Sequence, residues 1–408
     1  MIQVASQREE ILKVYKSELK AELKRILYYW ITTVIDEEDG GFYGRIGHDN
    51  KVVSGSPKGS VLNSRILWAF SAAYNLTRDP EYLVTAQRAF DYLSNNLVDM
   101  EFGGVYWTVD HAGKPLDTKK QTYATAFAIY GLAEYYKTGN NPESRELAIN
   151  LYNHIVTYTI DKRYGGYFEA LSRNWAVIDD LRLSDKDANE KKSMNTHLHI
   201  IEGFSNLFSI WPDGQLKSKI EDLHSIFLKH IINLENDHLH LFFEEDWTVK
   251  STLISYGHDI EASWLLLDTA EIIQSRLYID WFRIWSIKLA KAASEGLDKD
   301  GGLWYEFEPA DNHLQKEKHS WPQAEAMIGY FNAWQLTGDK GQLVASLNSW
   351  QFIKAHIADE KTGEWVWGVF EDYTVMDRED KVGLWKCPYH NSRACIEIIR
   401  RISNYIKD

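Results

Sequence analysis

The stretch DKRYGGYFE at Asp161–Glu169 combines an acidic residue, a glycine pair and aromatic side chains, and variants of it recur along the chain. The other copies read DEEDGGFYGR at Asp36–Arg45, MEFGGVYW at Met100–Trp107, ENDHLHLFFEED at Glu235–Asp246, DKDGGLWYEFE at Asp298–Glu308 and DEKTGEWVWGVFED at Asp359–Asp372. The first glycines of five copies are Gly40, Gly103, Gly165, Gly301 and Gly363. They lie 63, 62, 136 and 62 residues apart, and the gap of 136 spans two periods with a degenerate copy between them. Six copies of a repeat near 62 residues therefore fill the 408-residue chain.

The segments between the copies have helical periodicity, with apolar residues recurring at three and four positions and Gly, Asn or Asp near the ends. Examples are EYLVTAQRAFDYLSNNL at 81–97, ATAFAIYGLAEYYKTG at 124–139, SKIEDLHSIFLKHII at 218–232 and AEAMIGYFNAWQLTG at 324–338. The glycine–aromatic element is short and alternating, which predicts a tight turn or a small hairpin. Each repeat then holds two helices.

Six helix pairs closed into a ring give an all-α (α/α)6 barrel with short β-hairpins in the connecting loops. We expect residues 1–408 to form a single catalytic domain of this kind. An open helical solenoid is the alternative for any helical repeat. The count of six favours closure, and so do the polar residues on otherwise apolar inner helices, because a closed barrel would bring them to one central cavity.

Charge and composition exclude several classes of protein. The chain has 45 Lys and Arg against 59 Asp and Glu, a net charge of −14, which disfavours nucleic acid as a partner. The longest strongly apolar stretch, Leu27–Ile35, is far shorter than the roughly 20 residues of a membrane span. No signal peptide is visible, and Cys387 and Cys395 cannot form a disulfide framework. We therefore expect a cytoplasmic protein without a membrane partner.

Two inner-helix segments carry polar groups where a core would hold leucine. LNSRILWAF contains Arg65, and an arginine on an apolar face is rarely buried without an anionic or polar partner. The alternative is an arginine that reaches the barrel rim. In SMNTHLHIIEGF, Asn195 and His199 are four residues apart and share a helix face. His197 lies about 200° around the helix from His199, so we expect it to be a packing residue.

Two further segments carry a histidine and a charged residue three positions apart. In ISYGHDIEASWLLL, Glu261 shares a face with His258 and would fix its tautomer, although a core His–Glu pair is the commoner arrangement. In WKCPYHNSRACIEI, Pro388 places His390 at a helix start, with Arg393 one turn on. The chain has no HExxH, no phosphate-binding glycine loop and no GxSxG elbow. We expect no metal and no nucleotide cofactor.

These segments, together with LDTKKQTYATAFAIY and SWPQAEAM, closely resemble the N-acylglucosamine 2-epimerase superfamily, and most of all its members that act on disaccharides. The three histidine motifs in this order are specific, and the resemblance covers essentially the whole chain. It implies an (α/α)6 barrel and reversible epimerisation at C2 of the reducing-end glucose of a β-1,4-linked disaccharide such as cellobiose or lactose.

The resemblance also implies roles for individual residues. His258 and His390 match the two general acid/base histidines, and His199 matches a third site histidine. The substrate-contacting or supporting positions are Arg65, Tyr123, Asn195, Glu261, Trp321 and Trp385, with Asp187 in a loop near the outer sugar. It implies no metal or nucleotide cofactor. We expect a disaccharide as substrate, and a monomer or weak homodimer.

The chemistry requires acid–base groups. The C2 hydrogen of an aldose is acidic only beside an open-chain aldehyde, so the site must open the ring, remove the proton and return one to the opposite face. Imidazoles suit proton transfer near neutral pH, and an arginine can stabilise the enediolate. The alternatives are a monosaccharide N-acylglucosamine 2-epimerase, an aldose–ketose isomerase, a glycoside hydrolase or a non-catalytic sugar-binding scaffold.

Overall fold

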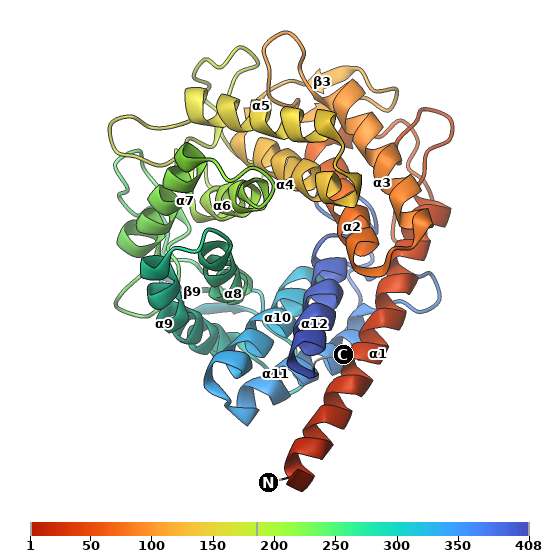
Figure 1. Ribbon diagram of the computed structural model, residues 1–408, viewed down its shortest axis with the longest axis vertical. Helices are drawn as coiled ribbons and strands as arrows, with labels where there is room; N and C mark the ends of the chain where they lie inside the picture. The colour runs from red at the N-terminus through yellow and green to blue at the C-terminus, as the bar shows by residue number, and fades with distance from the viewer. Residues whose placement is uncertain (1, 185–186, 407–408) are drawn as a thin grey trace.

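The computed structural model describes residues 2–184 and 187–406, with side chains from residue 7 onward, and forms a ring of helix pairs (Figure 1). The inner helices are α2 (Ser60–Thr77), α4 (Thr122–Gly139), α6 (Met194–Phe208), α8 (Tyr256–Ile272), α10 (Ser320–Thr337) and α12 (His390–Ile406). Each packs against both inner neighbours, and α12 packs against α2, so the ring closes. The predicted (α/α)6 barrel is therefore confirmed, and the open solenoid is excluded.

The outer helices cover the ring and complete the helix pairs. They are α1 (Ile2–Thr33), α3 (Pro80–Tyr92), α5 (Pro142–Tyr158), α7 (Gly214–Ile226), α9 (Arg276–Ala293) and α11 (Lys340–Phe352). Three of them continue into π-helical turns at Leu93–Leu97, Phe227–Ile231 and Ile353–Ile357, and α9 continues into a 3-10 turn at Ser294–Gly296. Since α1 packs on α12, the first and last helices of the chain close the circle. None of the described helices is long and apolar enough to cross a membrane.

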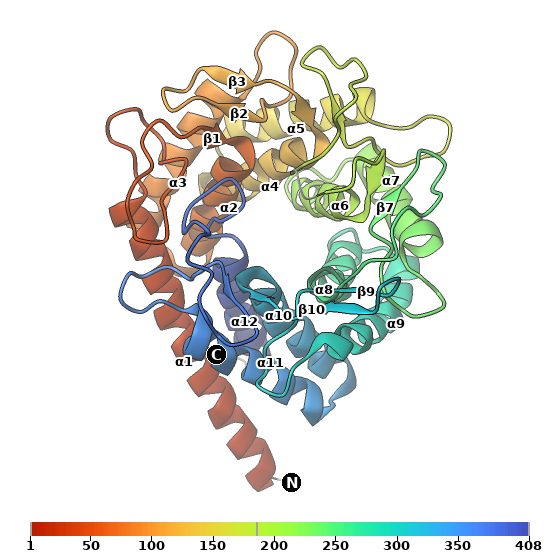
Figure 2. The same cartoon turned by 180° about the vertical axis from the view of Figure 1, so that it is seen from behind.

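Short strands and long loops gather at one end of the barrel (Figure 2). The strands are β1 (Lys58–Gly59), β2 (Thr108–Val109), β3 (Pro115–Asp117), β4 (Lys120–Gln121), β5 (Ala170–Leu171), β6 (Lys192–Ser193), β7 (Phe242–Phe243), β8 (Ile254–Ser255), β9 (Glu306–Glu308), β10 (His313–Gln315), β11 (Lys318–His319) and β12 (Gly368–Val369). Each strand that leads into an inner helix pairs antiparallel with a strand of the following loop, as β4 does with β5. This pairing ties consecutive repeats together where the inner helices begin.

The glycine–aromatic repeat is a tight turn closed by an antiparallel bridge, as predicted. In the third copy Ile160 bridges Tyr167, and Gly165 has a φ of 73°. The fourth copy has Asp237 in this position with a φ of 64°. Asp tolerates the left-handed region better than most residues, because its short side chain can hydrogen-bond locally. The degenerate copy thus keeps the turn without the glycine.

Buried lysines pair with aspartates of the turns. Four of the lysines lie on the strands that precede inner helices, and Lys381 lies in the loop before α12. The pairs join Nζ to a carboxylate oxygen in Lys58–Asp36 at 2.7 Å, Lys120–Asp99 at 2.8 Å, Lys192–Asp161 at 2.6 Å, Lys318–Asp298 at 2.7 Å and Lys381–Asp359 at 2.6 Å. In the fourth copy, Ile254 and Asn233 occupy the two positions, so the lysine and the aspartate are replaced together. His238 Nδ1 contacts Asp259 at 2.7 Å there instead.

We predict that Lys58→Ile lowers the free energy of unfolding by about 3–5 kcal/mol, because it leaves the buried Asp36 carboxylate without its cation. Adding Asp36→Asn reproduces the fourth copy and should recover much of the loss. Urea unfolding of the wild type, the single variants and the double variant measures this coupling. If the loss of unfolding free energy in the double variant equals the sum of the losses in the two single variants, the two side chains are not coupled. The ion pair would then not be the source of the stabilisation.

Candidate active site

Three histidines lie near the N-terminal ends of the inner helices, at the end of the barrel where the loops gather. His199 lies on α6 and His258 on α8, and α12 begins at His390, as predicted. The Trp321 ring lies between two of them, with its centroid 4.8 Å from that of His258 and 5.6 Å from that of His390. The structure therefore brings His258, His390 and Trp321 together from three different helices.

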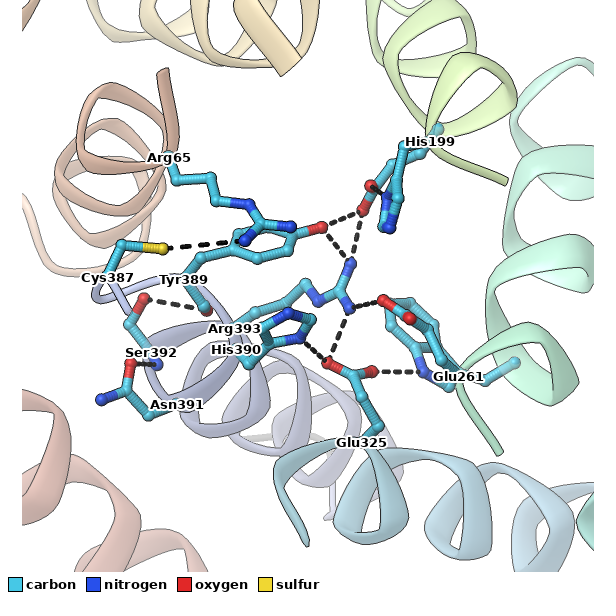
Figure 3. A network of polar contacts seen from close by, with 12 residues as sticks. Arg65, His199, Glu261, Glu325, Cys387, Tyr389, His390, Asn391, Ser392 and Arg393 are labelled. Atoms are coloured by element: carbon cyan, nitrogen blue, oxygen red, sulfur yellow. Dashed lines mark hydrogen bonds and ion pairs between the residues drawn. The ribbon is translucent and has the colours of Figure 1, made fainter. Parts of the chain in front are cut away.

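Arg393 is the centre of a polar network that joins the inner helices (Figure 3). Its Nη1 donates to Glu202 Oε1 at 2.5 Å, and its Nη2 donates to Glu261 Oε1 at 2.5 Å and Glu325 Oε1 at 2.6 Å. It also contacts the Tyr389 hydroxyl, which donates to Glu202. The three glutamates come from α6, α8 and α10, so one guanidinium joins four inner helices.

Each histidine has a hydrogen-bond partner at Nδ1. His390 Nδ1 lies 2.7 Å from Glu325 Oε1, and His199 Nδ1 lies 2.9 Å from Glu202 Oε2. His258 Nδ1 lies 2.8 Å from Ser255 Oγ. A proton on Nδ1 shared with these oxygens leaves Nε2 as the basic nitrogen. Each of the three rings can then accept a proton at Nε2.

The prediction that Glu261 orients His258 is wrong. The two residues share a helix face, but Glu261 gives its carboxylate to Arg393, and Ser255 at the start of α8 holds the His258 ring. A buried guanidinium is a stronger partner for a carboxylate than a neutral imidazole. Sequence reasoning missed Glu202, Glu325, Tyr389 and Ser255. Glu202 could have been found from its place three residues after His199, whereas the signal for Glu325 was a glutamate on an otherwise apolar helix.

Arg65 is buried, with 3% of its surface exposed, and in the described part of the chain its hydrogen-bond partners are Tyr123 and Cys387 rather than a carboxylate. Its Nη2 donates to the Tyr123 hydroxyl at 2.7 Å, and its guanidinium lies over the rings of Phe127 and Tyr389, 4.2 Å and 4.7 Å from their centroids. Burial alone would lower the pKa of Arg65, but Tyr123 and Cys387 raise it above its usual range. Arg65 thus presents a fixed positive charge without a counter-ion.

Aromatic rings continue from Arg65 toward the loops. Tyr123 meets the His199 ring edge-on at 5.0 Å, and Trp385 lies 5.9 Å from Tyr123 and 5.7 Å from Trp107, centroid to centroid. Asn195 is on α6 with a buried Oδ1 that has no partner. Asn195 lies one helical turn before His199, and Trp385 contacts Tyr123, which contacts the His199 ring.

Asp187 and His197 have mainly local contacts. The Asp187 carboxylate accepts from the backbone N–H of Ser184 at 2.9 Å and from its hydroxyl at 2.7 Å. No described hydrogen bond joins it to the histidines. His197 is fully buried, with Nδ1 2.7 Å from the Ser193 carbonyl and Nε2 accepting from the Tyr167 N–H at 3.0 Å. It is a packing residue, as predicted.

The buried setting divides the ionisable groups into neutral bases and fixed charges. Burial lowers the pKa of His258 to about 4, against a small opposing effect of Glu261, and burial lowers the pKa of His390 well below its usual value. Burial would raise the pKa of Glu202, but Arg393 lowers it to about 2. At neutral pH, His258 and His390 are therefore uncharged and able to accept a proton, whereas Glu202 is ionised.

One group in the described part of the chain has the spacing of a metal site, although none was expected. Ligand atoms of Glu261, Glu325 and His390 lie within 4.8 Å of one another. Arg393 already donates to both carboxylates from between them. A guanidinium therefore supplies the positive charge that a metal ion would bring, and the donor set fits the arginine. The sequence did not reveal this group because its members lie on three helices.

The fold and the imidazole-lined end of the ring define an (α/α)6-barrel protein with a buried acid–base site. The family model for N-acylglucosamine 2-epimerase (GlcNAc 2-epimerase) matches residues 41–394. The chain belongs to this family.

Two relatives and one solved structure specify the similarity further. The chain is 46% identical to a cellobiose 2-epimerase of Bacteroides fragilis, over 95% of this chain and 99% of that protein. It is 37% identical to a cellobiose 2-epimerase of Dictyoglomus turgidum, over 96% and 100% respectively. The structure of cellobiose 2-epimerase from Spirochaeta thermophila superposes with a TM-score of 0.91 at 36% identity, covering 97% of this chain and 98% of that one.

We predict that His258 stays neutral down to about pH 4, well below the ordinary value of 6.5. Histidine-selective ¹⁵N NMR, assigned with His258→Ala, measures this titration. Because the unfolded chain takes up a proton near pH 6.5 and the folded one does not, the free energy of unfolding should decrease as the pH falls from 6.5 toward 4. A His258 signal that titrates at or above 6.5 would contradict the burial of this ring.

Proposed function

We propose that the protein is a cellobiose 2-epimerase, an isomerase that reversibly inverts C2 of the reducing-end glucose in β-1,4-linked disaccharides. It would convert cellobiose to glucosyl-mannose and lactose to epilactose. The observation that carries the proposal is the pair of neutral imidazoles, His258 and His390, on either side of Trp321 and near the uncompensated charge of Arg65. The identity of 46% to a cellobiose 2-epimerase supports the choice of substrate.

The reaction begins with opening of the sugar ring. The proton on O1 leaves and a proton reaches O5, so ring opening changes neither charge nor composition. A neutral imidazole that accepts the O1 proton can return it to O5. The resulting aldehyde makes the C2 hydrogen acidic.

The second stage removes that hydrogen. The C2–H bond breaks, its electrons form the cis-enediolate, and the proton passes to the Nε2 of His258 or His390. Both rings are poised to accept it, because burial keeps them neutral at neutral pH. Arg65 is the group that we assign to the negative oxygen, since it is charged and has no carboxylate partner in the described chain.

The third stage returns a proton to the opposite face of C2 and restores the aldehyde. The second imidazole can deliver it after it takes up a proton from water, while the first imidazolium releases the C2 proton to water, so the proton count is unchanged. Alternatively, rotation about the C2–C3 bond presents the other face to the first imidazole. Glu325 beside His390 and Glu202 beside His199 stabilise an imidazolium at those rings. We assign the third histidine, His199, a supporting role because Glu202 can stabilise its protonated form.

A second sugar ring needs an apolar face to lie on. Trp385 and Trp107 lie 5.7 Å apart in loops next to Tyr123 and extend the aromatic surface away from His199. We assign this tryptophan surface to the outer sugar, with Asp187 near it. Arg65, Tyr123, Asn195, Glu261 and Trp321 are assigned as substrate-contacting or supporting positions. A monosaccharide epimerase or an aldose–ketose isomerase would not need it.

A glycoside hydrolase on this barrel is disfavoured by the same network. It would need two carboxylates about 5–10 Å apart with one free to donate a proton and one free to attack or activate water. Glu202, Glu261 and Glu325 are all bound to Arg393. None of the three is available as a nucleophile.

We further propose that residues 1–408 form one catalytic domain, since the first and last helices close the ring together. A cytoplasmic location remains a prediction, supported by two buried, unpaired cysteines. The oligomeric state, a monomer or a weak homodimer, also remains a prediction.

Incubation with cellobiose followed by product identification tests the function. The proposal expects glucosyl-mannose. Free glucose would indicate a hydrolase, and unchanged cellobiose would indicate a binding scaffold. A preference for free N-acetylglucosamine or mannose would favour the monosaccharide alternatives.

We predict that His258→Ala and His390→Ala each lower kcat by about 10²–10⁴-fold or more while the fold is retained, because no other group replaces the lost base. Initial rates and circular dichroism measure the two effects. His111→Ala, at a half-exposed histidine whose Nδ1 lies 2.9 Å from Asp39, is the matched control and should keep full activity. A folded His258 or His390 variant with near-wild-type turnover would remove that residue from the mechanism.

A further inference from the structure

The turn that carries His390 is held on both sides by one buried carboxylate, that of Glu364. Glu364 is fully buried in the sixth glycine–aromatic turn, between α11 and β12. Its Oε1 accepts from Asn391 Nδ2 at 2.8 Å and from Lys386 Nζ at 3.1 Å. Lys386 precedes His390 by four residues, and Asn391 follows it directly. The Glu364 carboxylate therefore fixes the chain before and after this histidine.

The same carboxylate also contacts the outer helix α1. Its Oε2 accepts a hydrogen bond from Nε1 of Trp30, which is completely buried. The backbone N–H of Trp365 donates to Oε1 at 2.5 Å. An ionised carboxylate only accepts hydrogen bonds, so these four donors satisfy it without conflict. Glu364 thus connects α1, the sixth glycine–aromatic turn and the start of α12.

The place of the His390 ring depends on this connection, because His390 is the first residue of α12. Its Nδ1 lies 2.7 Å from Glu325 Oε1 on α10, and a small shift of the α12 backbone would lengthen that contact. Pro388 restricts backbone rotation two residues earlier. A displacement of about 1 Å in a reacting group can lower a rate by about 10²-fold. The turn must therefore be held firmly if His390 is to transfer a proton.

Glu364 does not itself belong to the group of reacting side chains. In the described part of the chain its hydrogen-bond partners are Trp30, Trp365, Lys386 and Asn391, and none of them is a site histidine. The Asn391 side chain points away from the His390 ring (Figure 3). Any effect of Glu364 on the reaction must therefore pass through the backbone of the turn.

A neighbouring glutamate offers a matched comparison. Glu22 is also buried, and its carboxylate accepts from Trp365 Nε1 at 2.5 Å and from Arg25 Nε at 2.8 Å. Like Glu364, it joins a tryptophan and a cation between α1 and the sixth glycine–aromatic turn. Its described hydrogen bonds do not reach the residues on either side of His390. The two glutamates thus differ in the contact that matters here.

We propose that Glu364 is a positioning residue for His390. Through Asn391 and Lys386 it holds the start of α12, so that Nδ1 of His390 meets Glu325 and Nε2 stays free to accept a proton. The proposal rests on the proposed function, in which His390 transfers a proton of the substrate.

Kinetics of three variants test this role, with circular dichroism as the check of the fold. Glu364→Gln replaces one acceptor oxygen with a donor group and leaves Lys386 without its carboxylate, so kcat for cellobiose should fall about tenfold or more. Asn391→Ala removes one donor and should also lower kcat, and it keeps the proposal testable if Glu364→Gln does not fold. The loss in the double variant should be smaller than the product of the two single losses, because both changes break one contact. Glu22→Gln should keep the wild-type kcat.

Histidine-selective ¹⁵N NMR, assigned with His390→Ala, measures the ring without relying on activity. In the wild type, Nδ1 of His390 should carry the proton that it shares with Glu325. In Glu364→Gln and Asn391→Ala the ring should populate both tautomers, while the His258 signals keep their wild-type positions. Glu22→Gln should leave both sets of signals unchanged, which a general loss of stability would not predict.

Three results would overturn the positioning role: wild-type kcat in folded Glu364→Gln or Asn391→Ala, unchanged His390 signals in those variants, or an equal loss of kcat in Glu22→Gln. If the wild type does not convert cellobiose at all, the proposed function fails. The NMR comparison then still decides whether Glu364 fixes the His390 ring.

Discussion

The buried guanidinium of Arg393 is the interaction on which the rest of the site depends. A charge in this position requires partners, and removing one member of such a buried pair costs about 3–5 kcal/mol. Arg393 finds three glutamates on three other helices and fixes the spacing of α6, α8, α10 and α12. Two of these glutamates also hold histidines, Glu202 at His199 and Glu325 at His390. The rings are thus positioned by the same charge that joins the helices.

The repeated frame brings these residues to one end of the barrel. Each inner helix starts at a loop, and lysine–aspartate pairs anchor five of the six described loop turns to the strands that precede those helices or to the loop before α12. Polar residues near the start of an inner helix therefore face the loops. Residues near its end, such as Asp268, line a cavity of about 570 Å³ at the opposite end of the ring.

Much of the fold and part of the site followed from the sequence. The spacing of glycines gave the number of repeats, and helical periodicity together with Pro388 placed His390 at the start of α12. Glu202 and Ser255, the partners of His199 and His258, lie three positions away and were within reach of helix-face reasoning, but the partner of His390 was not. Glu325 and His390 are 65 residues apart, and helix-face reasoning sees only neighbours three or four positions away. For the same reason Glu261 was assigned to His258, when Arg393, 132 residues along the chain, was its true partner.

The central claim is that imidazoles on separate helices move the C2 proton of the substrate. Proton NMR of cellobiose incubated with the enzyme in D₂O tests it most directly. An imidazolium proton exchanges with solvent between its removal and its return, so the account predicts deuterium at C2 of the glucosyl-mannose product. Epimer formed without deuterium at C2 would contradict exchangeable transfer through His258 and His390, and would require either a shielded single-proton shuttle or a different bond-breaking step.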